Sequence, residues 1–458
     1  MSTASNISGT EKRAIASLAS LYALRMLGLF MVLPVMAVAG AEFEGATPEL
    51  LGLAIGAYGL SQALLQIPAG ALSDYFGRKP IIVIGLLIFA LGSFIAANAD
   101  SIYGIIVGRF LQGCGAIASA VMALVSDLTR EEHRMKAMAS IGASIGLSFS
   151  VALVLGPLLV HFGGLQLIFV ITGVLSLAGI ALLLYLVPTP ARKRHRDGSA
   201  ILSEVFKQLG NSQLWPLNIG IFILHALMVA MFLAIPQQLI QAGLSLDQHA
   251  WMYLPVLLIA FVLMVPFVII AEKKRQMKGI VISALGIMIL ALILMSQAEM
   301  IWAWAIALGI FFWAFNIMEA TLPSWLSKIA PAGAKGSIMG IYSTLQFLGA
   351  FAGGLIGGWL NNHFGIEGLF LILAAAVFAW AILVIVSPKP AHLNSVRIDI
   401  LNLGSGEDQS ALYLDALINL RGVADAILIA EEQAIYLKVD ASVFDYQQAL
   451  ATVNSLGE

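Results

Sequence analysis

Apolar runs of about twenty residues recur along the whole chain, and this repetition limits the folds that the chain can adopt. The hydrocarbon core of a bilayer is about 30 Å thick and is crossed by roughly 20 apolar residues in a helix. Lipid offers no hydrogen bonds to a bare backbone, so spanning segments of this length must be helical. We therefore predict an all-α membrane protein with twelve spans, near residues 14–40, 50–72, 80–98, 102–126, 137–161, 166–188, 214–241, 248–271, 278–297, 301–326, 336–361 and 366–387.

The composition agrees with lipid as the main solvent. Of the 458 residues, 60% are hydrophobic and 11% are charged, whereas about 25% of a soluble globular chain is charged. The net charge of −2 leaves no basic excess for binding nucleic acid. The single cysteine, Cys114, excludes an intramolecular disulfide and a cysteine-based metal site. No catalytic motif or phosphate-binding glycine loop can be recognised, so we expect neither an enzyme nor an ATP-driven pump, and no cofactor.

The spans fall into two sets of six. The longest polar stretch between spans, 189–213, predicts a cytoplasmic linker between an N-terminal half, 1–188, and a C-terminal half, 214–388. From 393 to 458 the composition becomes that of a soluble protein, and strand and helix periodicities follow one another in the order βαββα. We predict a small ferredoxin-like α+β domain there. Its layout resembles heavy-metal-associated domains without their C-x-x-C, so metal binding is not expected, and its partner stays open.

Lysine and arginine are confined to alternate loops, which orients the chain in the membrane. One set of loops carries all the loop cations, among them Arg78, Lys79, Arg130 and Lys273. The other set contains neither residue type and comprises residues 41–49, 97–101, 162–165, 242–247, 298–300 and 362–365. Cytoplasmic loops carry the positive charge of membrane proteins. We therefore expect both termini to be cytoplasmic.

Two arginines, one histidine and one glutamate lie well inside predicted spans, away from the span ends: Arg25 in the first, Arg109 in the fourth, His225 in the seventh and Glu319 in the tenth. Such residues usually face a partner or a water-filled cavity. These spans are the first helices of four successive three-helix units, and equivalent helices of inverted repeats surround a common substrate site. We expect the four groups, with Gln112, to converge on a central cavity. The alternative for each is a buried polar residue bonded to a neighbouring helix.

After the second span, the segment GALSDYFGRKPII brings together two glycines, one acid and two cations: Gly70, Asp74, Gly77, Arg78 and Lys79. Gly77 suits a tight turn between antiparallel helices, because glycine adopts backbone conformations that other residues resist. Arg78 can form a bidentate bond with a carboxylate such as Asp127, at the cytoplasmic end of the fourth span. A solvated basic loop would explain the two cations, but neither the acid nor the glycine spacing.

Small residues mark two further spans as closely packed helices. In the fourth span, GRFLQGCGAIASA places glycines and alanines beside Arg109 and Gln112. In the fifth, Ala152, Gly156 and Pro157 form a small-residue face with a kink. Helix packing explains these fifth-span residues better than direct contact with a substrate.

With these motifs the sequence resembles the major facilitator superfamily over residues 14–388, and within it the drug/proton antiporter group. GALSDYFGRKPII resembles motif A of that superfamily, RFLQGCGA resembles motif B, and Gly156 with Pro157 matches part of motif C, which is associated with antiporters. The second-half copy of motif A is degenerate, with remnants at Pro266, Glu272, Arg275 and Lys278. The resemblance implies a bacterial inner-membrane protein working by alternating access of two six-helix halves. It also implies that Asp74, Arg78 and Asp127 form a charge network that favours the outward-facing state.

The expected function is proton-coupled export, by antiport, of small apolar or cationic compounds. Glu319 is the first candidate for the proton carrier, because a buried carboxyl group can hold a proton at neutral pH. His225 is the second, because its charge changes near neutral pH. Arg25 and Arg109 would supply fixed positive charge, to a substrate anion or to Glu319.

Two other functions stay open. The first is a proton symporter or uniporter for an anionic metabolite, because two intramembrane arginines against one carboxylate favour an anion. The second is a membrane sensor whose soluble domain gives the output, which would bind its ligand without turnover. In every case the expected partners are a small molecule and the lipid bilayer, with protons for the coupled carriers.

Overall fold

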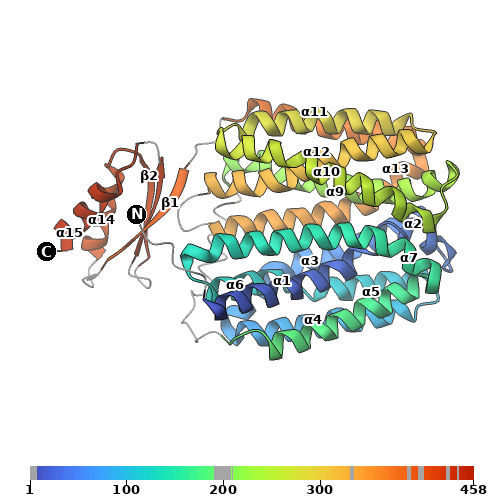
Figure 1. Cartoon of the computed structure of the whole chain (residues 1–458), viewed down its shortest axis with the longest axis horizontal. Coiled ribbons are helices and arrows are strands. Elements are labelled where there is room, and N and C mark those ends of the chain that lie inside the picture. Colours follow the sequence, from blue (N-terminus) through green and yellow to red (C-terminus); the bar gives the residue numbers. More distant parts are fainter. Residues whose placement is uncertain are drawn as a thin grey trace.

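The computed structural model describes residues 8–189, 208, 210–330, 335–388, 393–400, 407–429, 434–440 and 443–457. A bundle of long helices occupies most of the molecule, and a small domain with a β-sheet lies at one end (Figure 1). We call this end of the bundle, where α1 begins, the domain end, and the opposite end the far end. Of the linker expected at 189–213, only residues 189, 208 and 210–213 are described.

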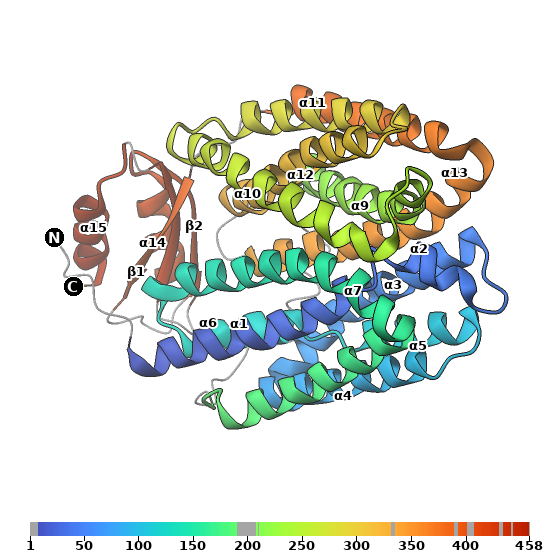
Figure 2. The same cartoon turned by 45° about the vertical axis from the view of Figure 1, so that its right-hand side comes forward.

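The bundle consists of two groups of helices that follow one another in the chain. The first group is α1 (Gly9–Phe30), α2 (Met36–Ala39), α3 (Pro48–Phe76), α4 (Arg78–Ala97), α5 (Ile102–Cys114), α6 (Ala118–Leu128) and α7 (Glu131–Tyr185). The second is α9 (Trp215–Gln241), α10 (His249–Lys273), α11 (Met277–Ser296), α12 (Ile301–Ile329) and α13 (Lys335–Val386). The two groups form separate layers in the rotated view (Figure 2).

Two of these helices cross the bundle twice. The backbone of α7 leaves helical values at Gly163 and Gly164, and that of α13 does so at Gly365. Gly164 and Gly365 both have φ of +66°, a conformation that side chains with a Cβ atom rarely adopt. Within the described residues, ten apolar helical segments are long enough to span a membrane, and the two double ones raise the number of crossings to twelve. This confirms the all-α membrane fold predicted from the sequence.

Two spans that the sequence predicts as continuous are interrupted. The first does not run to residue 40: α1 ends at Phe30, and turns at 31–35 lead into the short α2. The fourth is broken at 115–117, between α5 and α6. Apolar composition does not show these breaks, because a turn buried between helices is as apolar as the helix that it replaces.

The outward faces of the bundle are apolar, as lipid requires. On α10, for example, Leu258, Ile259, Phe261 and Val262 are all exposed. A soluble protein rarely presents such a large contiguous apolar surface. The exposed apolar side chains therefore mark the surface that lipid covers.

The small C-terminal domain has the element order βαββα that the sequence predicts. Its elements are β1 (Leu393–Asp399), α14 (Glu407–Ile418), β2 (Val423–Ile429), β3 (Ala434–Asp440) and α15 (Tyr446–Gly457). The three described strands form an antiparallel sheet in the order β1-β3-β2. Buried side chains of the sheet and both helices, including Ile398, Tyr413, Leu437 and Val453, form a core of its own.

Candidate functional site

A cavity of about 150 Å³ lies between the two groups of helices. Most of its wall is apolar or aromatic, and the polar groups come from both sides. The lining residues are Tyr22, Met26, Leu29, Phe30, Leu33, Ile55, Tyr58, Gly59, Arg109, Ala118, Ile145, His225, Met228, Val229, Ser343, Gln346, Phe347 and Ala350. An apolar pocket with a few polar groups is the usual form of a small-molecule site.

Arg109, on α5, is the cation in the cavity wall. Its side chain is 1% exposed; Nε donates to the carbonyl oxygen of Ala54 at 3.3 Å and Nη1 to Gln112 Oε1 at 2.8 Å. Gln112 in turn donates to Ser93 Oγ at 2.8 Å, and the guanidinium lies 5.2 Å from the centre of the Tyr58 ring. All these partners are neutral. The positive charge of Arg109 therefore has no carboxylate partner among the described residues.

Arg25, on α1, lies behind Tyr58 and is also 1% exposed. Its Nη2 donates to Tyr58 Oη at 3.1 Å, Gln62 Oε1 at 3.0 Å and the carbonyl oxygen of Gly115 at 2.9 Å. Gly115 is at the break between α5 and α6, so the interrupted helix supplies a backbone acceptor to a buried cation. Within the described residues, Arg25 Nε and Nη1 have no hydrogen-bond partner.

On the other side of the cavity, His225 of α9 lies between Gln346 and Glu319. Gln346 Nε2 is 2.7 Å from His225 Nε2, and the carbonyl oxygen of Ile221 is 3.3 Å from His225 Nδ1. A neutral ring with its proton on Nδ1 satisfies both contacts. Glu319 Oε1, on α12, is 3.5 Å from His225 Nε2 and makes no hydrogen bond in the described part of the chain. The Glu319 side chain is 35% exposed as a whole, but Oε1, the oxygen that faces His225, is buried.

The four ionisable residues singled out in the sequence thus occupy two positions relative to the cavity. Arg109 and His225 line it, whereas Arg25 and Glu319 each stand one side chain behind the wall. Gln112 also stands behind the wall, as a partner of Arg109. Fixed positive charge is on the side of the first helix group, and the histidine–glutamate pair is on the side of the second.

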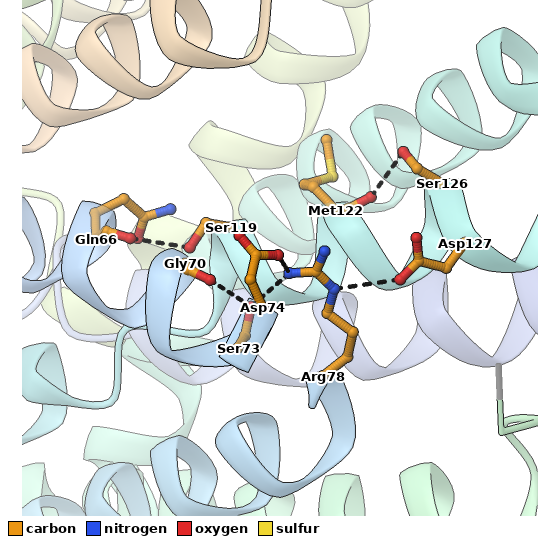
Figure 3. A network of polar contacts seen from close by, with 9 residues as sticks. All are labelled: Gln66, Gly70, Ser73, Asp74, Arg78, Ser119, Met122, Ser126 and Asp127. Carbon is orange, nitrogen blue, oxygen red and sulfur yellow. Dashed lines mark hydrogen bonds and ion pairs between the residues drawn. The ribbon is translucent and has the colours of Figure 1, made fainter. Parts of the chain in front are cut away.

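The loop motif between α3 and α4 folds into a local charge network (Figure 3). Arg78 forms ion pairs with Asp74 and, at 3.2 Å, with Asp127 of α6, and it donates to Ser73 Oγ at 2.7 Å. Gly77 has φ of +99°, which explains the glycine in this turn. All these groups belong to the first helix group, at its domain end.

The two other residues of the motif have structural contacts of their own. Lys79 Nζ donates to the carbonyl oxygen of Val187 at 2.7 Å, joining the start of α4 to the end of α7. A Cβ atom at Gly70 would lie 3.1 Å from Ser119 Oγ, so Gly70 allows α3 to approach α6 closely.

Gly156 has a similar role on α7, because a Cβ atom there would lie 2.5 Å from the carbonyl oxygen of Met31. Pro157 lies inside α7, next to this contact.

The degenerate copy of the motif, between α10 and α11, keeps the lysine contact of the first copy and changes the others: Lys278, like Lys79, donates to a backbone carbonyl oxygen at the end of the last helix of its group. Glu272 pairs with Lys328 of α12, and Lys278 Nζ donates to the carbonyl oxygen of Ile385 at 2.8 Å. Arg275 has φ of +55° where the first copy has a glycine, and it lies 3.6 Å from Asp440 of strand β3. The C-terminal domain therefore contacts the bundle at this turn.

Sequence reasoning missed the glycines that join the two helix groups between the cavity and the far end. A Cβ atom at Gly59 would lie 2.6 Å from the carbonyl oxygen of Phe347, and one at Gly358 would lie 2.5 Å from that of Pro48. Gly52 and Gly354 likewise touch backbone to backbone. The spacing of small residues in α3 and α13, typical of close helix pairs, was the available signal.

Sequence reasoning also missed the neutral polar residues around the buried charges. Tyr58, Gln62 and Gln346 are partners of Arg25 and His225. The two glutamines could have been identified from the sequence as amide side chains inside apolar spans, because a buried amide needs hydrogen-bond partners.

The Major Facilitator Superfamily sequence pattern matches residues 18–354. The chain therefore belongs to this superfamily of membrane transporters, as its resemblance implied. The inner membrane transport protein YajR of Escherichia coli strain K12 is 45% identical to it over 446 residues, covering 96% of this chain and 97% of that protein. The multidrug resistance protein MdtH of Aeromonas salmonicida is 26% identical over 345 residues, covering 75% of this chain and 86% of that protein.

Solved structures of transporters share the fold. A bacterial homologue of the human lysosomal transporter Spinster, in an inward-facing and occupied conformation, superimposes with a TM-score of 0.70 at 14% identity, covering 83% of this chain and 97% of that one. The human organic anion transporter MFSD10 gives a TM-score of 0.61 at 17% identity, covering 82% of this chain and 100% of that one. At these identities the likeness concerns the fold.

Proposed function

We propose that this chain is a proton-coupled secondary transporter of small organic compounds in which Glu319 carries the proton. The observation that carries the proposal is the 3.5 Å approach of Glu319 to His225 beside the cavity. A carboxyl group and an imidazole can both gain and lose a proton in this setting, whereas an arginine keeps its proton. His225 stands between Glu319 and the cavity, so it is the group through which a proton would pass.

Transport would proceed by alternating access of the two helix groups. The glycine contacts between α3 and α13 hold the groups together by backbone packing, and Asn362 Nδ2 donates to Glu49 Oε1 at 2.7 Å across the same interface. Within the described residues no salt bridge joins these two helices. Such an interface can separate and close again with small changes in energy. The contacts of the Arg78 network all lie within one helix group. From the resemblance to the superfamily we propose that this network favours the outward-facing state.

We further propose that the chain resides in a bacterial inner membrane with both termini cytoplasmic. The name of the YajR relative supports the membrane, and the distribution of lysine and arginine among the loops supports the orientation. The far end of the bundle would then face the periplasm, and the C-terminal domain the cytoplasm.

Two directions of coupling are candidates. Export of apolar or cationic compounds by proton antiport is supported by the multidrug resistance name of the MdtH relative and by the partial antiporter motif at Gly156 and Pro157. Proton symport or uniport of an anionic metabolite is supported by Arg109, whose charge in the cavity wall has no carboxylate partner among the described residues.

Flux through reconstituted protein tests the proposal. The full chain in liposomes with a lumenal pH indicator would be given small aromatic compounds of each charge, comparing wild type, Glu319→Gln and Glu299→Gln. Glu299 is exposed and serves as the matched control. We expect substrate-dependent proton movement in wild type and Glu299→Gln, and its loss in Glu319→Gln.

The same assay separates the candidates. Substrate entry through an antiporter raises the lumenal pH, whereas entry through a symporter lowers it, and a uniporter leaves it unchanged. A sensor would bind the compounds without moving them. If Glu319→Gln still moved protons together with substrate, the proton would have to be assigned to another group.

A further inference from the structure

We propose that the cavity selects a small organic anion, with one ring-sized apolar body and one anionic group held by Arg109. This inference rests on the proposed transport function but not on its direction. Its basis is the charge balance of the cavity and its immediate surroundings, together with the size and chemistry of the wall.

The charges around the cavity are unequal. Arg25 and Arg109 both point their guanidinium groups at neutral partners only, and both are almost wholly buried. Glu319 is the single carboxylate near the cavity in the described part of the chain, and it lies against His225 on the opposite side. A buried charge without a counter-ion is costly and attracts one. Two fixed cations against one carboxylate leave room for a single negative charge.

The wall argues against a cation. Aromatic rings can hold a cation by their faces, and Tyr58 is one of the rings lining this cavity. Its face, however, already lies 5.2 Å from the Arg109 guanidinium, and its hydroxyl accepts from Arg25. A cationic ligand would meet like charge here, whereas an anionic group would be attracted by both arginines.

The size of the cavity sets the size of the apolar body. An apolar cavity of about 150 Å³ accommodates one benzene ring, and this cavity, which is partly open, has about that volume. Phe30, Phe347 and Met228 supply apolar contacts to such a ring. Ser343 and Gln346 lie in the same wall and can orient a polar substituent.

An anionic substrate also bears on the direction of coupling. A proton on Glu319 removes the one negative charge near the cavity, so a proton and an anion strengthen each other's binding. A carrier that binds the proton and the anion at the same time moves both across the membrane in the same direction. The inference therefore favours the symport candidate over antiport.

Equilibrium binding of three probes of similar shape tests the inference. Benzenesulfonate is anionic, phenyltrimethylammonium is cationic and benzenesulfonamide is neutral. With the full chain in lipid nanodiscs, we expect benzenesulfonate to bind at least about tenfold more tightly than the other two, which corresponds to about 1.4 kcal/mol. We expect Arg109→Gln to abolish this preference and Arg109→Lys to retain part of it.

A second pair of variants keeps the test independent of the arginine's role in folding. Ser343→Asp adds a negative charge to the wall, and Ser343→Asn is its neutral control. We expect Ser343→Asp, but not Ser343→Asn, to weaken benzenesulfonate binding and strengthen phenyltrimethylammonium binding.

Three results would overturn the inference: tighter binding of the cation, an unchanged preference in both Arg109→Gln and Ser343→Asp, or binding of none of the probes. Binding requires no proton gradient, so it is separate from the proposed function. Selective benzenesulfonate binding without proton-linked flux would refute the coupling and leave the charge selection standing.

Discussion

The proposed alternation of the two helix groups predicts that closing of the far end depends on glycine at position 358. A Cβ atom at Gly358 would lie 2.5 Å from the carbonyl oxygen of Pro48 and 3.2 Å from Glu49 Cα, atoms of the backbone of the other helix group. Ordinary van der Waals contact begins near 3.4 Å. In Gly358→Ala the helices must therefore separate by nearly 1 Å, or the far end must open.

The expected cost follows from overpacking at a tight contact, about 1–3 kcal/mol. The added methyl group clashes only when the far end is closed. The whole cost therefore falls on that state and raises the ratio of open to closed molecules about 5- to 150-fold. Gly340→Ala is the control, because it lies on the same helix, α13, and a Cβ atom there would have no neighbour within 4 Å.

Reactivity of a buried far-end cysteine would measure this ratio. Leu233 is buried and its Cδ1 lies 3.3 Å from the place of a Cβ atom on Gly52. In a Cys114→Ala background, Leu233→Cys should react with a bulky maleimide at least about fivefold faster when combined with Gly358→Ala. The Gly340→Ala combination should react at the parent rate. Equal rates in the two combinations would refute the reasoning.

Two further predictions concern the ends of the helices and the docked domain. Arg78→Lys should lower the melting temperature, because the single ammonium group of lysine cannot bind Asp74 and Asp127 at once as the planar guanidinium does. The expected loss of folding free energy is about 1–3 kcal/mol, and an unchanged melting temperature would contradict the prediction. Lys438→Met should release the C-terminal domain, because Lys438 is 4% exposed and its Nζ donates to the carbonyl oxygen of Ser327 on α12 at 3.0 Å. Proteases should therefore remove the domain faster in Lys438→Met than in the wild type. Arg421→Met, which alters an exposed residue of the same domain, should be cleaved at the wild-type rate. Equal cleavage rates in the two variants would contradict a role of Lys438 in holding the domain.

The contacts of the first loop motif were accessible from the sequence because they are local. Asp74 and Arg78 are four residues apart, on either side of Gly77, which forms the turn between two antiparallel helices. Asp127 lies at the same membrane level, at the end of the fourth span. Short distances along the chain, or a shared depth in lipid, limit the partners that such charges can find.

The cavity wall was less accessible. The sequence places Arg25, Arg109, His225 and Glu319 at membrane depth, but it does not say which of them touches the cavity. In a soluble helix a polar face shows the direction of the core. In a lipid-embedded bundle both faces of a helix are apolar, so the rotation of each helix about its axis leaves no periodic signal.

The sequence by itself determined that the chain crosses lipid as helices, how many times it does so, and which loops share a side. These properties follow from the length of each apolar run and from the lysines and arginines in each loop, and the bilayer constrains both one segment at a time. The tertiary structure alone decided the break at Gly115, the backbone contacts of Gly52 with Gly354, and the docking of Lys438 on α12. Each of these depends on atoms from segments far apart in the chain, which meet only after the helices have packed.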